Sequence, residues 1–439
     1  MLLTFLTTSP NTTAVPPQYS RRKKIFAALF SGKKYDDTLM RYLIHQILKI
    51  VKIYFIQKQL ETDETDMQIL LSRAARKRGL DDFFEREIES AAKLNSENLY
   101  RDGQYHFKNY LILSEQLKYI IAKRRKGEVP YEAIAESLTQ FFCTEVLRHN
   151  CEAQSYKAVI GRDLKMDFLD ETIHWFEAKM GEKELEGSTD NLSTKIYYHT
   201  FRALQSCDNQ HFEELKRLIS QYSMYLPKEE VTFIYSAAMN FCTKKINMGE
   251  SPFRVQLFDL MQTGLEKKLF LDNGFLSKFI YKNVVTTGLL LEKYDWVRDF
   301  IESSKENLHP KERELVYNYN LAVYYFRKGD YDQAMPLLQR GDFGDVLTNL
   351  AARALLLRIY YDTEAFDALM SLTDSFQIFL SRQKELTYQK DNYSNLIHIV
   401  RKMLRLDLRN AEIRKRLREE IQQTQYLAER SWLLEKLAD

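Results

Sequence analysis

The chain has 439 residues, of which 45% are hydrophobic and 28% charged, so it can bury a large core and is not intrinsically disordered. Its formal net charge of +3 is close to neutral for this length, so composition alone gives no argument for a nucleic-acid partner. Only 14 Gly and 8 Pro interrupt the chain, which is fewer than a sheet-rich fold with a turn every ~10 residues requires.

The N-terminal residues 1–20 are predicted to be a disordered leader, because a short apolar start is followed by polar residues and prolines. The most apolar stretch of the chain follows at Leu43–Ile56. Polar residues, among them Lys49 and Lys52, interrupt this stretch, so it never approaches the ~18 uncharged apolar residues of a membrane span. We therefore expect a buried helix there and no membrane partner.

Helix boundaries recur along the chain with the same residue types. Cations followed by glycine at Gly79, Gly127 and Gly329 are typical of helix ends, where cations oppose the negative end of the helix dipole and glycine adopts the left-handed conformation. Proline followed by acids at Pro227 and Pro310 is typical of helix starts. Apolar residues between these boundaries recur at helical spacing, which predicts an all-α protein of roughly 14–16 helices.

An internal repeat is the strongest signal in the sequence. Trp296, Tyr331 and Phe366 are evenly spaced, and each is predicted to open the second helix of a helix pair. In the middle copy, the small residues Ala322 and Ala334 lie where the two helices of the pair must approach closely. This middle copy resembles a tetratricopeptide repeat (TPR) unit, and the outer copies are degenerate versions of it.

The chain as a whole is also similar to an uncharacterised family of bacterial helical-repeat proteins. The segments that carry this resemblance are residues 76–81, 281–285, 317–322, 355–361 and 366–369. Together the two resemblances imply a right-handed α-solenoid of TPR-like helix pairs with some longer, irregular helices. They do not imply a particular activity.

The expected organisation is an N-terminal helical region at 21–190, a TPR-like array at 191–400 and a C-terminal capping helix at 401–439. Residues Asn410–Leu437 are predicted to form one long helix, capped by the first of them, whose apolar stripe covers the preceding repeat. Eight basic residues against two acids fall between positions 401 and 418. This cluster can follow a phosphate backbone, or it can be the solvated face of a final helix.

Catalytic motifs are nearly absent from the sequence. Asp342–Gly344 spells the kinase tripeptide, but the other kinase motifs are missing. His149 and Cys151 have no second pair of metal ligands at zinc-site spacing. The four cysteines lie far apart, which is typical of reduced core thiols in a reducing compartment. We expect a cytoplasmic protein that is not an enzyme and that uses no cofactor and no metal.

The predicted function is a protein-binding scaffold or adaptor that uses the concave face of the solenoid. The positions that face the groove in TPR-like units correspond here to Tyr319, Phe326, Arg327, Arg358 and Tyr361. The competing interpretation of these residues is that degenerate repeats turn them into the core. The alternative function is a helical-repeat protein that binds nucleic acid or another polyanion through the basic clusters.

Overall fold

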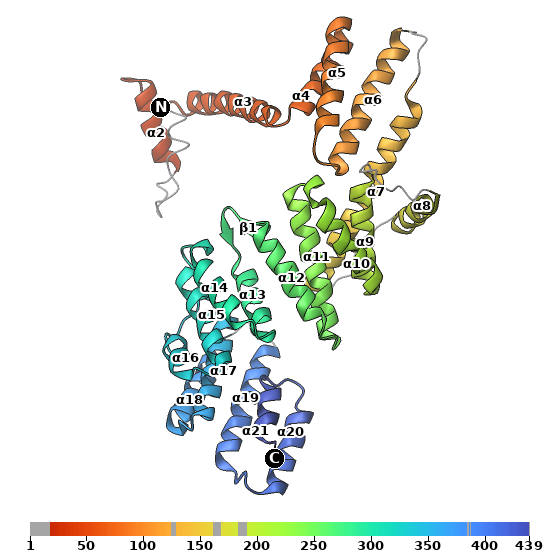
Figure 1. Cartoon of the computed structure of the whole chain (residues 1–439). Helices are drawn as coiled ribbons and strands as arrows, with labels where there is room; N and C mark the ends of the chain where they lie inside the picture. The colour runs from red at the N-terminus through yellow and green to blue at the C-terminus, as the bar shows by residue number, and fades with distance from the viewer. Residues whose placement is uncertain are drawn as a thin grey trace. The chain divides into compact units, whose positions relative to one another are not determined.

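The computed structural model describes residues 18–123, 129–160, 168–182, 191–383, 386 and 388–438 (Figure 1). Twenty α-helices lie in these ranges, more than the sequence predicted, together with one two-stranded hairpin and two 3-10 turns. The prediction of an all-α solenoid is confirmed. Most of the predicted leader, residues 1–17, lies outside the described residues, whereas its last three residues begin the first described helix.

The chain divides into two compact units, and each is described by itself. The first unit comprises residues 1–146 and 170–194. Its helices are α2 (Gln18–Leu29), α3 (Asp37–Glu61), α4 (Glu64–Arg78), α5 (Asp81–Glu97), α6 (Gly103–Lys123), the first half of α7 (Tyr131–Ile160) and most of α8 (Leu169–Glu182).

A small bundle of α4, α5 and α6 forms the core of the first unit. Its buried apolar residues include Phe84, Ile112 and Tyr119, and the rings of Phe84 and Tyr119 lie 4.3 Å apart. Gly79 ends α4 in the left-handed conformation at a φ of 69°, as its position after three cations predicted. Inside the bundle, the carboxylate of Glu115 is buried and paired with Arg73 and Arg76.

The second unit comprises residues 147–169 and 195–439 and consists of helices that pair in chain order. Its elements are the second half of α7, α9 (Leu192–Ser206, which starts at the unit boundary), α10 (Asn209–Tyr222), η1 (Ser223–Tyr225), α11 (Lys228–Asn247), α12 (Phe253–Glu266), β1 (Leu271–Asp272), β2 (Phe275–Leu276), α13 (Lys278–Leu290), α14 (Tyr294–Ser303), η2 (Lys305–Asn307), α15 (Arg313–Lys328), α16 (Tyr331–Leu338), α17 (Val346–Asp362), α18 (Phe366–Arg382), α19 (Tyr388–Arg405), α20 (Ala411–Gln423) and α21 (Arg430–Lys436). The first helix of one pair also packs on the first helix of the next, as α13 does on α15 and α15 on α17. This stacking defines the solenoid.

The helix pair α15–α16 has the features predicted from the middle repeat. Gly329 ends α15 with a φ of 78°, Tyr331 is the first residue of α16, and Ala322 and Ala334 are completely buried. In the next pair the left-handed residue of the turn is Glu364, at the position equivalent to Gly329. A non-glycine residue tolerates this conformation at a modest energetic cost.

The first copy of the repeat departs from the predicted alignment. Tyr294, not Trp296, opens α14, and the left-handed turn residue is Glu292. The even spacing of the aromatic residues was therefore misleading at this copy. Its close helix approach is made by Gly288, where an added Cβ would lie 2.5 Å from the side chain of Val297.

The predicted single C-terminal helix is wrong, because the chain turns between Thr424 and Glu429 and separates α20 from α21. Asn410 caps α20 as expected, since its side chain accepts hydrogen bonds from the backbone N–H groups of Glu412 and Ile413. Glu429 precedes α21 in the left-handed conformation, with a φ of 55°. The turn allows α21 to fold back onto the preceding helices instead of extending away from them.

The prediction of a buried helix at Leu43–Ile56 is also wrong in part. The helix exists as α3, but of its residues only Met40 is buried. Large apolar side chains on α3 are strongly exposed, with Phe55 at 65%. Apolar composition predicted that this helix would be covered, and within the described residues no other part of the chain covers it.

Candidate partner-binding site

The two predicted groove residues on α15, Tyr319 and Phe326, are buried, each with only 6% of its surface exposed. The Tyr319 ring packs edge-on against Phe343, with centroids 5.6 Å apart, and Phe326 stacks on Tyr331 at 5.7 Å. Burial raises the pKa of the Tyr319 hydroxyl well above its usual range. Both residues are part of the core of the array, as the competing interpretation expected, and neither offers an open anchor for a partner.

The predicted residues on α17 contact the chain's own C-terminal helix. The Arg358 guanidinium donates to the Glu429 carboxylate at 2.7 Å and lies over the rings of Phe326, at 4.7 Å, and Trp432, at 5.6 Å. The ring of Tyr361 meets Trp432 edge-on at 5.4 Å. Arg358 and Tyr361 thus hold α21 by an ion pair and ring contacts, which are the interactions predicted for an external partner.

Further bonds fix α21 on this face. Lys436 pairs with Asp362 at 2.8 Å, and in the turn before α21 the backbone N–H of Ala428 donates to the carbonyl of Asn392 at 3.1 Å. Trp432 is 3% exposed and belongs to the same core cluster as Phe326. Trp432 was not among the predicted residues, although a tryptophan beside Leu433 is a recognisable packing signal.

Arg327 differs from the other four predicted residues because its side chain is exposed. It occupies the last turn of α15, where a cation opposes the helix dipole. The structure therefore brings together Phe326, Arg358 and Tyr361 beneath α21 and leaves Arg327 outside that contact.

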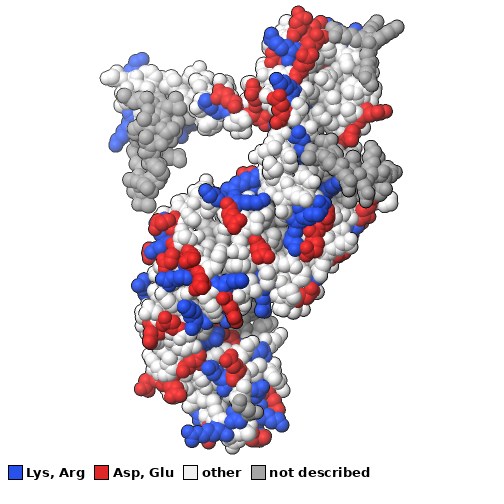
Figure 2. All heavy atoms as spheres, viewed as in Figure 1, with Lys and Arg blue, Asp and Glu red and all other residues white. Residues whose placement is uncertain are grey.

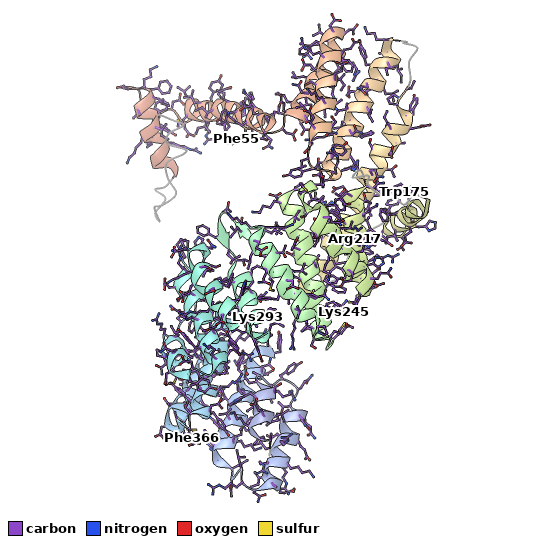
Figure 3. All side chains as sticks on the ribbon, in the orientation of Figure 1. Phe55, Trp175, Arg217, Lys245, Lys293 and Phe366 are labelled. Atoms are coloured by element: carbon purple, nitrogen blue, oxygen red, sulfur yellow. The ribbon has the colours of Figure 1, made fainter. Side chains whose placement is uncertain are left out.

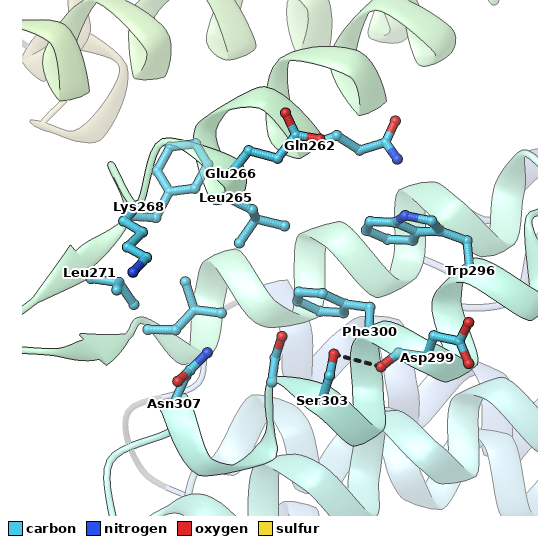
Figure 4. A pocket seen from close by; sticks show the side chains of 13 residues that line it. Gln262, Leu265, Glu266, Lys268, Leu271, Trp296, Asp299, Phe300, Ser303 and Asn307 are labelled. Atoms are coloured by element: carbon cyan, nitrogen blue, oxygen red, sulfur yellow. Dashed lines mark hydrogen bonds between the residues drawn. The ribbon is translucent and has the colours of Figure 1, made fainter.

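An open pocket of about 430 Å³ lies elsewhere in the array, among α12, the β1–β2 hairpin and α14 (Figure 4). Its apolar wall comes from all three elements and consists of Leu265, Phe270, Leu271, Leu276, Trp296 and Phe300. Its polar lining consists of Gln262, Glu266, Lys268, Asp299, Ser303, Ser304 and Asn307. The pocket thus offers an apolar interior with charges of both signs beside it.

Local sequence explains how the pocket is built. Asn273 and Gly274 both have positive φ, which is the geometry of a tight hairpin turn between β1 and β2. Gly264 on α12 lets the Phe270 ring lie against the helix backbone, since an added Cβ would be 2.2 Å from that ring. The hairpin was not predicted, although the Asn-Gly pair between apolar residues was the available signal.

Trp296 is the half-buried aromatic residue of the pocket. Its ring is parallel to Phe300 at 5.4 Å and meets Phe258 edge-on at 4.8 Å, so packing fixes its orientation. The nearby Ser303 hydroxyl donates to the backbone carbonyl of Asp299 at 2.7 Å. No histidine or cysteine lines the pocket. Its chemistry suits the binding of an apolar group, and it contains no paired nucleophile and base.

The basic segment at 401–418 is largely engaged within the protein. Arg401 pairs with Asp374, and Lys402 with Glu420 at 2.6 Å. Arg418 donates to the carbonyls of Leu434 and Leu437, at the end of α21. Figure 2 shows blue and red side chains interspersed over the visible face of this region. A second basic cluster that the alternative function invoked, KRRK at residues 123–126, lies outside the described residues apart from Lys123.

The residues considered as metal ligands have other partners. Cys151 is fully buried and its thiol lies 3.5 Å from the carbonyl of Tyr197, whereas His149 is 3.0 Å from Glu152. Burial raises the pKa of Cys143 and of Cys242 to about 12, while Cys207 is only half-buried. In the part of the chain that the structure describes, no group of three or more His, Cys, Asp or Glu is placed to hold a metal ion.

One titratable pair is notable in the array. The Nδ1 atoms of His199 on α9 and His211 on α10 lie 2.9 Å apart. Burial, and then the neighbouring His211, lowers the pKa of His199 to about 4.

Among the described helices, none combines the length and apolarity required to cross a membrane.

Comparisons with known proteins find little sequence similarity. No protein-family model matches the sequence, and no curated protein matches it. Among solved structures, the chain is similar to the crystal structure of yeast Tom70, with 12% identity, a TM-score of 0.30 and coverage of 90% of this chain and 89% of that one. A TM-score this low assigns neither a family nor a function to the chain.

Proposed function

We propose that the protein is a cytoplasmic, non-catalytic scaffold that binds another protein through its helical-repeat array. The observation that supports this proposal is the open pocket between α12 and α14, whose lining includes a half-buried Trp296, Asp299 and Lys268. Tryptophan held in a fixed orientation and surrounded by polar groups is typical of residues that dominate binding energy at protein interfaces. The pocket volume suits one or two apolar side chains of a partner.

Two of the predicted concave-face residues, Arg358 and Tyr361, are occupied by contacts within the chain itself. Arg358 and Tyr361 contact Trp432 of the chain's own helix α21, and Arg358 also pairs with Glu429 directly before that helix. A partner can use these two residues only after α21 has left. Arg327 is the predicted residue that remains exposed on α15.

The alternative, binding of a polyanion, has less support. The cations of the 401–418 segment that pair with Asp374 and Glu420 are already neutralised, and a polyanion would have to compete with these carboxylates. Salt separates the two functions. The affinity for a polyanion should fall steeply between about 50 and 200 mM salt, whereas the affinity for a partner held in an apolar pocket should fall only modestly.

The experiment compares proteins that co-purify with the full chain and with two variants. Ser303→Trp fills the pocket, because Ser303 is exposed on its lining. Ser381→Trp is the matched control, since Ser381 is also an exposed serine near a helix end whose hydroxyl donates to a backbone carbonyl. We expect the amount of at least one co-purifying protein to fall about tenfold or more with Ser303→Trp and to stay unchanged with Ser381→Trp. A partner set that is the same for both variants would contradict the proposal.

A further inference from the structure

Helix α3 exposes an apolar surface that the pocket does not explain. Its strongly exposed large apolar side chains are Tyr42, Leu48, Ile50, Ile53, Tyr54, Phe55 and Ile56. Figure 3 labels Phe55 among the side chains that project from this helix. A contiguous apolar surface of this kind is rare on proteins that have no partner and marks an interaction site.

The exposed surface extends around the helix instead of following one stripe. The four consecutive residues Ile53–Ile56 are each at least 49% exposed, and successive helical residues are about 100° apart, so these side chains point in four directions. A helix that is apolar on all sides is normally buried on all sides. Whatever covers the C-terminal half of α3 must therefore enclose it from more than one direction.

The charge on α3 has a single sign between its ends. From Thr38 to Leu60 the helix carries Arg41, Lys49, Lys52 and Lys58 and no acidic residue. Arg41 and Lys58 pair with Asp37 and Glu61 at the two ends of the helix, so the charge that α3 presents to a partner is that of the exposed Lys49 and Lys52. The preceding helix α2 adds exposed Lys23 and Lys24. In Figure 2 the surface of α3 is largely white. The complement of this surface is apolar at its centre and acidic at its edges.

We propose that α3 is a docking helix for an acidic protein partner, whose own helices enclose it and place carboxylates beside Lys49 and Lys52. This site is separate from the pocket between α12 and α14, and its test does not depend on that pocket. The contacts would be apolar side chains around Phe55, with ion pairs at the rim that select an acidic partner.

Other occupants fit the surface less well. A second copy of α3 packed antiparallel about the helix centre would bring Lys49 and Lys52 of the two copies together, and like charges repel. An anionic lipid surface attracts the cations but covers only one side of a helix. That leaves part of the exposed set at Ile53–Ile56 in water.

The experiment uses photo-cross-linking by the full chain in the cells that produce it. Phe55 is replaced by p-benzoylphenylalanine, which cross-links to any C–H group within reach. The matched control carries the same replacement at Phe279, which is 68% exposed on α13. The cross-linked peptides are sequenced, and lipid adducts are measured on the same material.

We expect adducts from position 55 to a segment of another protein that has a net negative charge, well above the level at position 279. Adding Lys49→Glu and Lys52→Glu should reduce their yield about fivefold or more, while the melting temperature stays unchanged because both side chains are exposed. Adducts to phospholipid, to a second copy of the chain or to a non-acidic segment would overturn the proposal. So would a yield equal to that of the control, or a yield that charge reversal does not change.

Discussion

Helices α3 and α17 show that similar apolar sequences can have opposite environments. Both carry apolar residues around most of their circumference. In α17 the adjacent residues Leu356 and Leu357 are both buried, because α15, α16 and α18 pack around the helix. In α3 the adjacent residues Tyr54 and Phe55 are both exposed. The sequence of a helix indicates that it needs covering, but the covering element is specified elsewhere, either in the same chain or in another one.

The largest expected effect lies in α17. Leu357→Ser removes a fully buried side chain and leaves a hydroxyl in an apolar core, so we expect a loss of about 4 kcal/mol in the free energy of unfolding. Urea unfolding followed by circular dichroism measures it. A loss below about 1 kcal/mol would mean that α17 is not enclosed as described.

The next effect tests how the array covers its own last helix. Arg358→Ala removes the ion pair with Glu429 and the ring contacts with Phe326 and Trp432, which should cost about 2 kcal/mol. Arg327→Ala is the control, since that side chain is exposed and should change stability by less than about 0.5 kcal/mol. Equal melting temperatures for the two variants would show that Arg358 does not hold α21.

The partly buried side chain of His199 makes the stability of the fold depend on pH. The folded protein lowers the pKa of His199 from its ordinary value near 6.5 to about 4, so the unfolded chain binds the proton more readily. The stability from neutral His199 is complete above pH 6.5 and is lost as the pH falls toward 4. We expect a loss of about 1 to 2 kcal/mol, because the side chain is only partly buried.

The measurement is the urea midpoint of the parent and of His199→Gln between pH 7 and pH 4.5. The variant lacks the titrating group and should lose less stability over this range. Parallel curves for the two proteins would assign the pH dependence to other groups.

The smallest effect belongs to α3. Ile53→Ser should change the free energy of unfolding by less than about 0.5 kcal/mol, since the side chain is 65% exposed before the substitution. Thermal unfolding of the isolated protein is sufficient to measure this. A marked destabilisation would show that α3 packs against the rest of the chain in solution, and the contrast with α17 would disappear.

Local signals were predictable because neighbouring residues determine them. Gly79 and Gly329 both adopt the left-handed conformation expected at helix ends, and Asn410 caps its helix. The helix pair around Ala322 and Ala334 also follows the predicted packing, since small residues permit a close helix crossing.

Features that depend on distant contacts were not predictable in the same way. The apolar stripe of Asn410–Leu437 is compatible with one long helix, and the break before α21 makes sense only once Arg358 and Trp432 are seen to meet. Groove positions transferred from a regular repeat predicted that Tyr319 and Phe326 lie on the concave surface. The helical spacing of these two residues is equally compatible with a buried position. The pocket depends on α12 and the hairpin that follows it meeting α14, which comes only after α13 in the sequence.

The reactivity of the four cysteine thiols can be used to measure how often each part of the fold opens. Cys143 lies in the first unit and Cys242 in the second, and for both thiols burial raises the pKa to about 12. A maleimide should therefore react early with the half-buried Cys207 and late with the buried thiols, at rates set by how often each unit opens. Mass spectrometry of the labelled peptides would give separate opening kinetics for the two units in one unmodified chain.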